Sequence, residues 1–191
     1  MADERFVSQE DNDSNFKLIK DNLLNYMSLD ARQIHPVNTN VANVNVAATE
    51  YATELGKFFT PHDGDLPRFD LIFLGIGEDG HTASLFPNGD GLREQTRYTV
   101  PVSLNYLKNE RVSLTLSVIN NARRVVFIAA GRSKGQIVKS VLEGSKDLPA
   151  ALVKPHQGEL IFLLDREAAN QIHLKDPNDF SYEEEAIVVK L

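Results

Sequence analysis

Hydrophobic positions along the chain follow two periodicities, one typical of buried strands and one typical of amphipathic helices. Continuous apolar runs predict strands at residues 71–76, 124–130 and 160–164. The first of these runs is long enough for a strand that is buried on both faces of a sheet. Apolar residues at helical spacing predict helices over residues 16–27, 47–59 and 137–142. Repeated strand, glycine loop and helix units indicate an α/β fold, with a Rossmann-like, mostly parallel sheet flanked by helices.

Length and composition limit the possible classes of protein. The 191 residues suit a single domain over residues 1–191, with residues 175–191 as a solvated C-terminal extension. The formal charge of −7 argues against a nucleic-acid partner, which requires a basic face. The chain has no cysteine, so disulfides and thiolate catalysis are excluded. Without a run of about 18 apolar residues or a secretory signal, we expect no membrane partner and a cytoplasmic protein.

The first predicted strand ends in a loop that contains glycines and two titratable side chains. Gly75, Gly77 and Gly80 allow tight turns or the close approach of a ligand to the backbone. Asp79 lies between Gly77 and Gly80, and His81 directly follows Gly80. Open α/β sheets usually place their ligands at such strand ends. A histidine oriented by a carboxylate can deprotonate a water that attacks an ester or lactone carbonyl. We therefore predict a catalytic pair of His81 and Asp79, with Gly77 in contact with the substrate.

Other interpretations of this loop remain open from the residues alone. In one interpretation, a helix that starts at Thr82 offers its backbone N–H groups to an oxyanion. In the other, Asp79 only caps that helix, and His81 is a structural loop residue. The glycine spacing does not fit a dinucleotide-binding fingerprint, and the histidines lack metal-ligand spacing. We therefore expect neither a cofactor nor a catalytic metal.

A second candidate site follows the strand at residues 124–130. Backbone amides of residues 131–135, at the start of a helix, and the ammonium of Lys134 would together suit a phosphate. A solvated basic helix start is the competing interpretation. Arg123 precedes the same strand and is a surface charge unless its loop folds inward, and Arg5 is either a ligand contact or a salt-bridge residue.

Several motifs together resemble one family. Residues 74–87 read LGIGEDGHTASLFP and closely resemble the signature of 6-phosphogluconolactonases, which share the glucosamine-6-phosphate isomerase/deaminase fold. The resemblance extends over about residues 3–170 through further segments in the same order: DERFV at 3–7, RVSLTL at 111–116, Gly131 with Lys134, and LPAALV at 148–153. The residues after His81 favour the lactonase branch over the deaminase branch.

The resemblance implies hydrolysis of 6-phospho-D-glucono-1,5-lactone to 6-phosphogluconate in the pentose phosphate pathway. His81 would be the general base that activates water and then the acid for the ring oxygen, with Asp79 orienting it. Arg5 and Lys134 would contact the substrate phosphate, and Arg123 is a weaker candidate. The sugar-phosphate lactone is the expected partner, and no cofactor is implied.

Members of this family begin with a further strand, a phosphate loop and helices before the Asp-Glu-Arg motif, which here starts at Asp3. We therefore expect an N-terminally truncated form with weakened or no activity. Two other functions remain open: an amino-sugar-phosphate isomerase or deaminase, and a catalytically silent protein that binds sugar phosphates.

Overall fold

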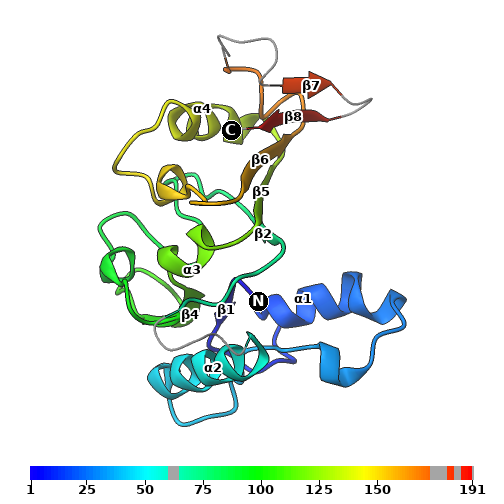
Figure 1. Cartoon of the computed structure of the whole chain (residues 1–191), viewed down its shortest axis with the longest axis vertical. Coiled ribbons are helices and arrows are strands. Elements are labelled where there is room, and N and C mark those ends of the chain that lie inside the picture. The colour runs from blue at the N-terminus through cyan, green and yellow to red at the C-terminus, as the bar shows by residue number, and fades with distance from the viewer. Residues whose placement is uncertain (60–64, 173–179, 183–185, 191) are drawn as a thin grey trace.

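A computed structural model describes residues 1–59, 65–172, 180–182 and 186–190, whose strands form two sheets (Figure 1). The strands are β1 Asp3–Arg5, β2 Ile72–Leu74, β3 Thr99–Val102, β4 Arg111–Leu114, β5 Arg124–Ala129, β6 Glu159–Leu164, β7 Phe180–Tyr182 and β8 Ile187–Lys190. The α-helices are α1 Asn15–Asn22, α2 Val44–Phe59, α3 Leu116–Asn120 and α4 Gly135–Leu142. Short 3-10 helices span Leu24–Tyr26, Ala31–Gln33, Asp90–Arg93, Arg132–Lys134 and Pro149–Leu152.

The larger sheet has five strands in the order β2-β5-β6-β8-β7. Its first three strands are parallel, with Leu74 opposite Phe127 and Phe127 opposite Phe162. These three strands are the apolar runs of the sequence, and the α/β fold predicted from them is confirmed. The sheet as a whole is mixed, because β8 and β7 are added in antiparallel orientation.

The C-terminal strand β8 belongs to this sheet. It pairs with β6 from Ile161 opposite Lys190 to Leu164 opposite Ile187, and Val189 is completely buried. The prediction of a solvated extension from residue 175 is therefore wrong for residues 187–190. Pairing with β8 satisfies the backbone groups along the outer edge of β6, which would otherwise be open. Residues 175–179, 183–185 and 191 of the predicted extension lie outside the described residues.

The smaller sheet is antiparallel and has the order β1-β4-β3. Helix α2 covers it, and the hydroxyl of Thr99 on β3 donates a 2.6 Å hydrogen bond to the carbonyl of Ala48 on α2. Strand β1 is held to the loop after β2 by a 2.7 Å hydrogen bond from the Ser84 hydroxyl to the Asp3 carboxylate. The smaller sheet is thereby fixed next to the glycine loop that the sequence singles out.

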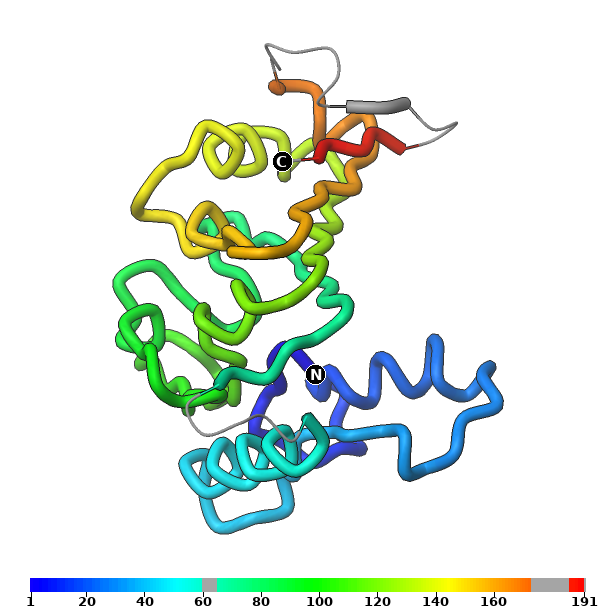
Figure 2. Tube along the Cα trace, in the orientation of Figure 1, coloured from blue at the N-terminus to red at the C-terminus, as the bar shows by residue number. Residues whose placement is uncertain are grey.

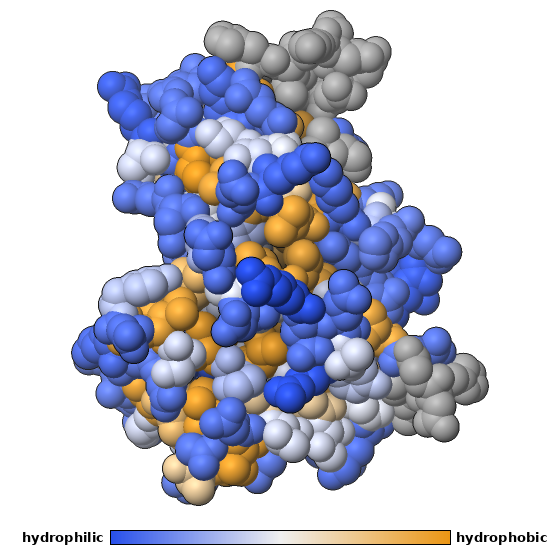
Figure 3. Space-filling model, turned by 90° about the vertical axis from the view of Figure 1, so that its left-hand side faces the viewer, coloured by the Kyte–Doolittle hydropathy of each residue, from blue (hydrophilic) through white to orange (hydrophobic). Residues whose placement is uncertain are grey.

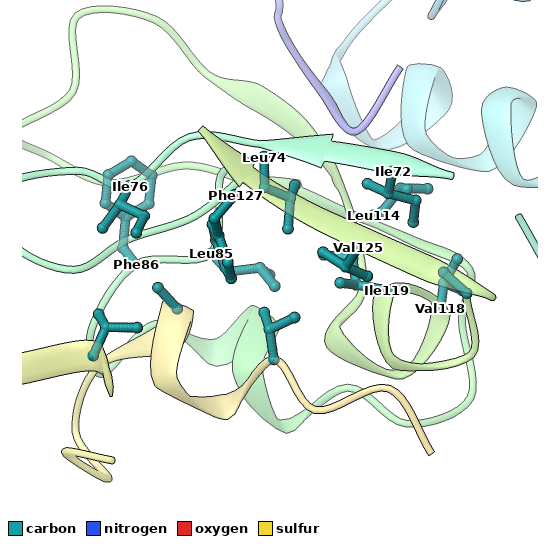
Figure 4. Close-up of a cluster of buried hydrophobic side chains, with 14 of the residues drawn as sticks. Ile72, Leu74, Ile76, Leu85, Phe86, Leu114, Val118, Ile119, Val125 and Phe127 are labelled. Atoms are coloured by element: carbon teal, nitrogen blue, oxygen red, sulfur yellow. The ribbon is translucent and has the colours of Figure 1, made fainter. Parts of the chain in front are cut away.

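The hydrophobic core lies along one face of the parallel strands and continues under the loop that follows β2 (Figure 4). Phe127 of β5 and Phe162 of β6 stack with their ring centroids 4.9 Å apart, and both are almost fully buried. Leu85 and Phe86, which follow the glycine loop, extend the same cluster. The loop is therefore built on the core.

The other face of the parallel strands is only partly covered among the described residues. Phe73 on β2 is 59% exposed and Ile128 on β5 is 47% exposed, whereas their neighbours Leu74 and Phe127 are buried. The prediction of a first strand buried on both faces is therefore wrong for β2. An apolar run is compatible with burial on both faces, but burial also requires a second layer. Helix α1 does not supply that layer, since it extends to the side (Figures 1 and 2) and has no buried residue.

The face turned toward the viewer in Figure 3 carries apolar patches among polar and charged side chains, a mixture that is ordinary for folded proteins. Among the described residues, none of the helices has both the length and the apolar character needed to cross a lipid bilayer.

Candidate functional site

The loop after β2 is a compact turn held by its own backbone. The Gly77 N–H donates to the carbonyl of His81 at 2.8 Å, and the Gly80 N–H donates to the carbonyl of Gly77 at 2.9 Å. The hydroxyl of Thr82, which is fully buried, donates to the carbonyl of Gly75 at 2.9 Å. Gly80 has a φ of +80°, a conformation that glycine adopts without steric cost. These contacts fix where His81 emerges.

No helix follows this loop, contrary to the sequence-based expectation. The N–H groups of Thr82 and Leu85 each bond to the other residue's carbonyl, at 3.3 and 2.9 Å, and Ala83 between them has a φ of +47°. A residue in that left-handed conformation cannot continue a right-handed helix. Asp79 is therefore not the cap of a helix that starts at Thr82, and no oxyanion-binding helix start lies there.

Asp79 is instead bonded to His81. The Nδ1 atom of His81 lies 2.6 Å from Oδ1 of Asp79, which also accepts the backbone N–H of His81 at 3.1 Å. Partial burial raises the pKa of the Asp79 carboxyl, but the hydrogen bonds from His81 outweigh this effect and hold that pKa below its usual value. An ionised carboxylate only accepts hydrogen bonds, so Nδ1 of His81 carries a proton, and in the neutral imidazole the lone pair is then on Nε2.

Gly77 leaves the space that this pair occupies. A Cβ at position 77 would lie 2.1 Å from Nδ1 of His81 and 2.6 Å from Oδ1 of Asp79. By contrast, a Cβ at Gly75 would meet no atom within 4 Å. The absence of a side chain at Gly77 therefore makes room for His81 and Asp79. The predicted contact of Gly77 with a substrate remains a proposal.

The imidazole of His81 is also held on its ring face. It stacks on Phe86, with centroids 4.5 Å apart and a tilt of 32° between the planes. Phe86 is buried, and the guanidinium carbon of Arg111 lies 5.7 Å from the centre of the same ring. The sequence-based prediction did not include Arg111. Its place depends on the pairing of β4 with β1, which no local pattern in the sequence specifies.

Lys134 is brought to the loop of His81. It lies in the turn after β5, the parallel neighbour of β2, and its ammonium donates a 2.8 Å hydrogen bond to the carbonyl of Ile76. Gly131 opens this turn with a φ of +90°. Adjacent parallel strands thus place a half-buried cation beside the glycine loop, as their common carboxyl-terminal edge predicts.

Arg5 lies on the smaller sheet, next to Arg111. It lies directly opposite Arg111 in the β1–β4 pairing, and its Nη1 donates to the backbone carbonyl of Asp13 at 2.9 Å and to the amide oxygen of Asn15 at 2.8 Å. Arg5 is half-buried. Since Arg111 is stacked over Phe86, and Phe86 on His81, Arg5 belongs to the same region of the molecule.

Arg123 is not brought to this region. It precedes the first residue of β5, next to the start of β2, and its side chain forms a 3.0 Å ion pair with Asp70. The glycine loop lies beyond the opposite ends of these parallel strands. The expectation that Arg123 contributes to the substrate site is therefore corrected: its loop keeps it at the far edge of the sheet.

A groove of about 590 Å³ lies elsewhere, between α2 and β3, lined by residues that include Thr49, Gly56 and Tyr98. None of the predicted site residues lines it. Its walls are mostly small and neutral side chains, whereas His81 and Asp79 lie at the glycine loop.

Comparison with known proteins agrees with this geometry. The family described as "Glucosamine-6-phosphate isomerases/6-phosphogluconolactonase" matches residues 1–162. The chain is similar to the 6-phosphogluconolactonase of Homo sapiens, with 40% identity over 172 residues that cover 88% of the chain and 65% of the human protein. The structure of 6-phosphogluconolactonase from Trypanosoma brucei superposes with a TM-score of 0.75 and 28% identity, covering 91% of this chain and 73% of that one.

A monomeric glucosamine-6-phosphate deaminase also superposes, with a TM-score of 0.73, over 90% of this chain and 73% of the deaminase. At 23% identity this likeness shows a shared fold alone. The chain spans just under two thirds of the length of the human relative.

Proposed function

We propose that this chain, which belongs to the family of glucosamine-6-phosphate isomerases and 6-phosphogluconolactonases, hydrolyses 6-phospho-D-glucono-1,5-lactone to 6-phosphogluconate. The observation that carries the proposal is the 2.6 Å contact between His81 and Asp79 on the loop after β2. A named lactonase at 40% identity supports this substrate over the amino-sugar phosphate of the deaminase, which shares only the fold.

In the proposed reaction His81 acts first as a base and then as an acid. Its Nε2 takes a proton from a water whose oxygen attacks the lactone carbonyl carbon, and a tetrahedral intermediate forms. The carbon–oxygen bond of the ring then breaks, and the imidazolium returns the proton to the departing ring oxygen. Asp79 stabilises the imidazolium and keeps Nδ1 protonated, so that Nε2 is the nitrogen that exchanges protons.

Two cationic groups are proposed to hold the substrate phosphate at the other end of the sugar. Arg5 and Lys134 are the residues of the early and late family motifs. Lys134 contacts the carbonyl of Ile76 in the loop that carries His81, and Arg5 lies opposite Arg111, whose guanidinium is over Phe86. The Nζ of Lys134 has three donors, of which the contact with Ile76 uses one. Contact of a ligand with the backbone at Gly77 is part of the same proposal.

The test compares two substrates on the unmodified chain. Release of 6-phosphogluconate is followed above the spontaneous hydrolysis of the lactone, and ammonia release from glucosamine 6-phosphate is followed in parallel. We expect lactone turnover and no deamination. Deamination without lactone turnover would assign the chain to the other branch, and binding of 6-phosphogluconate without either reaction would leave a silent sugar-phosphate-binding protein.

A further inference from the structure

The guanidinium of Arg111 is half-buried and lacks a partner for its inner nitrogen. Its Nε is buried and, among the described residues, has no hydrogen-bond partner. Burial lowers the pKa of Arg111, and the positive charge of Arg5 lowers it further. A buried donor left without an acceptor costs stability, so the fold alone does not account for the position of this guanidinium.

Arg111 also faces a like charge. It is paired in register with Arg5 across antiparallel strands β4 and β1, so both side chains lie on the same face of the smaller sheet. Like charges directly opposite each other destabilise a sheet. An anion placed between the two guanidiniums would turn this repulsion into two favourable contacts.

The acidic groups near Arg111 are already engaged. Asp3 accepts the hydroxyl of Ser84 at 2.7 Å, and Asp13 accepts the ammonium of Lys108 at 2.6 Å. Both carboxylates favour the charged form of Arg111 from a distance, but neither forms an ion pair with it among the described residues. The guanidinium of Arg111 is therefore available to an acceptor group on a bound ligand.

Arg111 and His81 both contact the ring of Phe86, which limits the distance between them. Its guanidinium carbon lies 5.7 Å from the centre of the Phe86 ring, and that ring lies 4.5 Å from the ring of His81, so His81 and the guanidinium are at most about 10 Å apart. A hexose 6-phosphate lactone carries its phosphate at the opposite end of the sugar from the reacting carbonyl. Because both groups contact the same buried ring, the guanidinium and the imidazole lie within the reach of one such substrate.

We propose that Arg111, paired with Arg5, binds the phosphate of the substrate through its terminal amino groups while Phe86 fixes its distance from His81. This inference rests on the proposed lactone hydrolysis for the identity of the substrate. The planar, forked guanidinium matches the geometry of a phosphate in a way that a lysine ammonium does not.

The test replaces Arg111 with methionine, which retains the apolar stem over Phe86 and removes the charge. The control is Arg124→Met, since Arg124 is exposed and ion-paired with Glu159 at the far end of β5. KM and kcat are measured for the phosphorylated lactone and for unphosphorylated glucono-1,5-lactone. Binding of 6-phosphogluconate and of gluconate is measured by calorimetry, which requires no turnover, and the melting temperature is recorded.

For Arg111→Met we expect a loss of about 10- to 100-fold in affinity for the phosphorylated ligands, little change for gluconate and its lactone, and a melting temperature that does not fall. Arg124→Met should bind as the unmodified chain does. Equal losses for phosphorylated and unphosphorylated ligands, or a lower melting temperature with unchanged phosphate affinity, would show a structural role and overturn the inference.

The two proposals fail in different ways. If the unmodified chain binds 6-phosphogluconate but hydrolyses no lactone, the proposed reaction is wrong, and a weaker binding by Arg111→Met still supports the phosphate site. If the unmodified chain hydrolyses the lactone and Arg111→Met does so with unchanged KM, only the role of Arg111 is wrong. Absence of both binding and turnover in the unmodified chain overturns both proposals.

Discussion

Replacing Gly77 with alanine tests the geometry of the pair formed by His81 and Asp79, to which we assign the catalysis, without changing either residue. The added methyl carbon would lie 2.1 Å from Nδ1 of His81, 2.3 Å from its Cε1 and 2.6 Å from Oδ1 of Asp79. Gly77 is not among the residues with positive φ, so alanine fits the backbone. The collision therefore falls on the imidazole and the carboxylate, which must move away.

The size of the movement follows from the contact distance. Ordinary contact begins at 3.4 Å, so a ring that starts 2.1 Å away must shift by about 1.3 Å. A misplacement of about 1 Å costs on the order of 100-fold in rate, and complete loss of a general base costs up to about 10,000-fold. We expect kcat for Gly77→Ala to fall by about 100- to 1,000-fold, or about 2.7 to 4 kcal/mol of transition-state stabilisation.

The assay is steady-state release of 6-phosphogluconate, with melting temperature as the measure of folding. Gly75→Ala is the matched control, because its added Cβ meets no atom within 4 Å and Gly75 also lacks a positive φ. That variant should keep the kcat of the unmodified chain. A folded Gly77→Ala protein with kcat within about threefold of the unmodified chain would refute the role assigned to the pair, since general-base catalysis is worth far more than that.

Three further changes have definite expected outcomes. Lys134→Met removes the donor to the Ile76 carbonyl, and we expect a higher KM for the phosphorylated lactone and a loss of about 1 kcal/mol in unfolding free energy. Thr82→Val leaves the Gly75 carbonyl without its buried hydroxyl donor, and chemical denaturation should show a loss of about 1 to 3 kcal/mol. Hydrogen bonds from the backbone N–H groups two and three residues later lower the pKa of Glu94 to about 2. Glu94 therefore stabilises the fold above about pH 4.5, and this stabilisation is lost as the pH falls through about 2. The melting temperatures of Glu94→Gln and of the unmodified chain should converge between about pH 4.5 and pH 2.

The sequence was informative where a local pattern determines the structure. The apolar runs correspond to the three parallel strands, and helical periodicity at residues 47–59 agrees with α2. The glycines at 75, 77 and 80 form the predicted tight loop, and Asp79 is bonded to His81. Each of these outcomes follows from residues that are close in the chain.

The remainder depends on contacts between distant segments. Phe73 has the same apolar character as Leu74, and only the absence of a second layer in the described structure exposes it. Residues 187–190 were predicted as an extension because their partner, β6, lies more than 20 residues earlier. Arg111 lies opposite Arg5 because β4 pairs with β1, over 100 residues away in sequence.

Arg123 illustrates the reverse error. The resemblance makes this residue a candidate for the phosphate contact, but it directly precedes β5, at the opposite ends of the parallel strands from His81, and is paired with Asp70. The end of the strand from which a side chain emerges decides whether it reaches the site, and this can be inferred once the parallel pairing of β2 and β5 is established.

The most direct test of the central claim is the kcat for 6-phosphogluconolactone hydrolysis by the unmodified chain and by His81→Ala, each corrected for spontaneous hydrolysis. The pair of His81 and Asp79 predicts turnover by the unmodified chain and a loss of about 100- to 10,000-fold in a folded His81→Ala variant. Equal rates for the two proteins, or no turnover above the spontaneous rate by the unmodified chain, would contradict it.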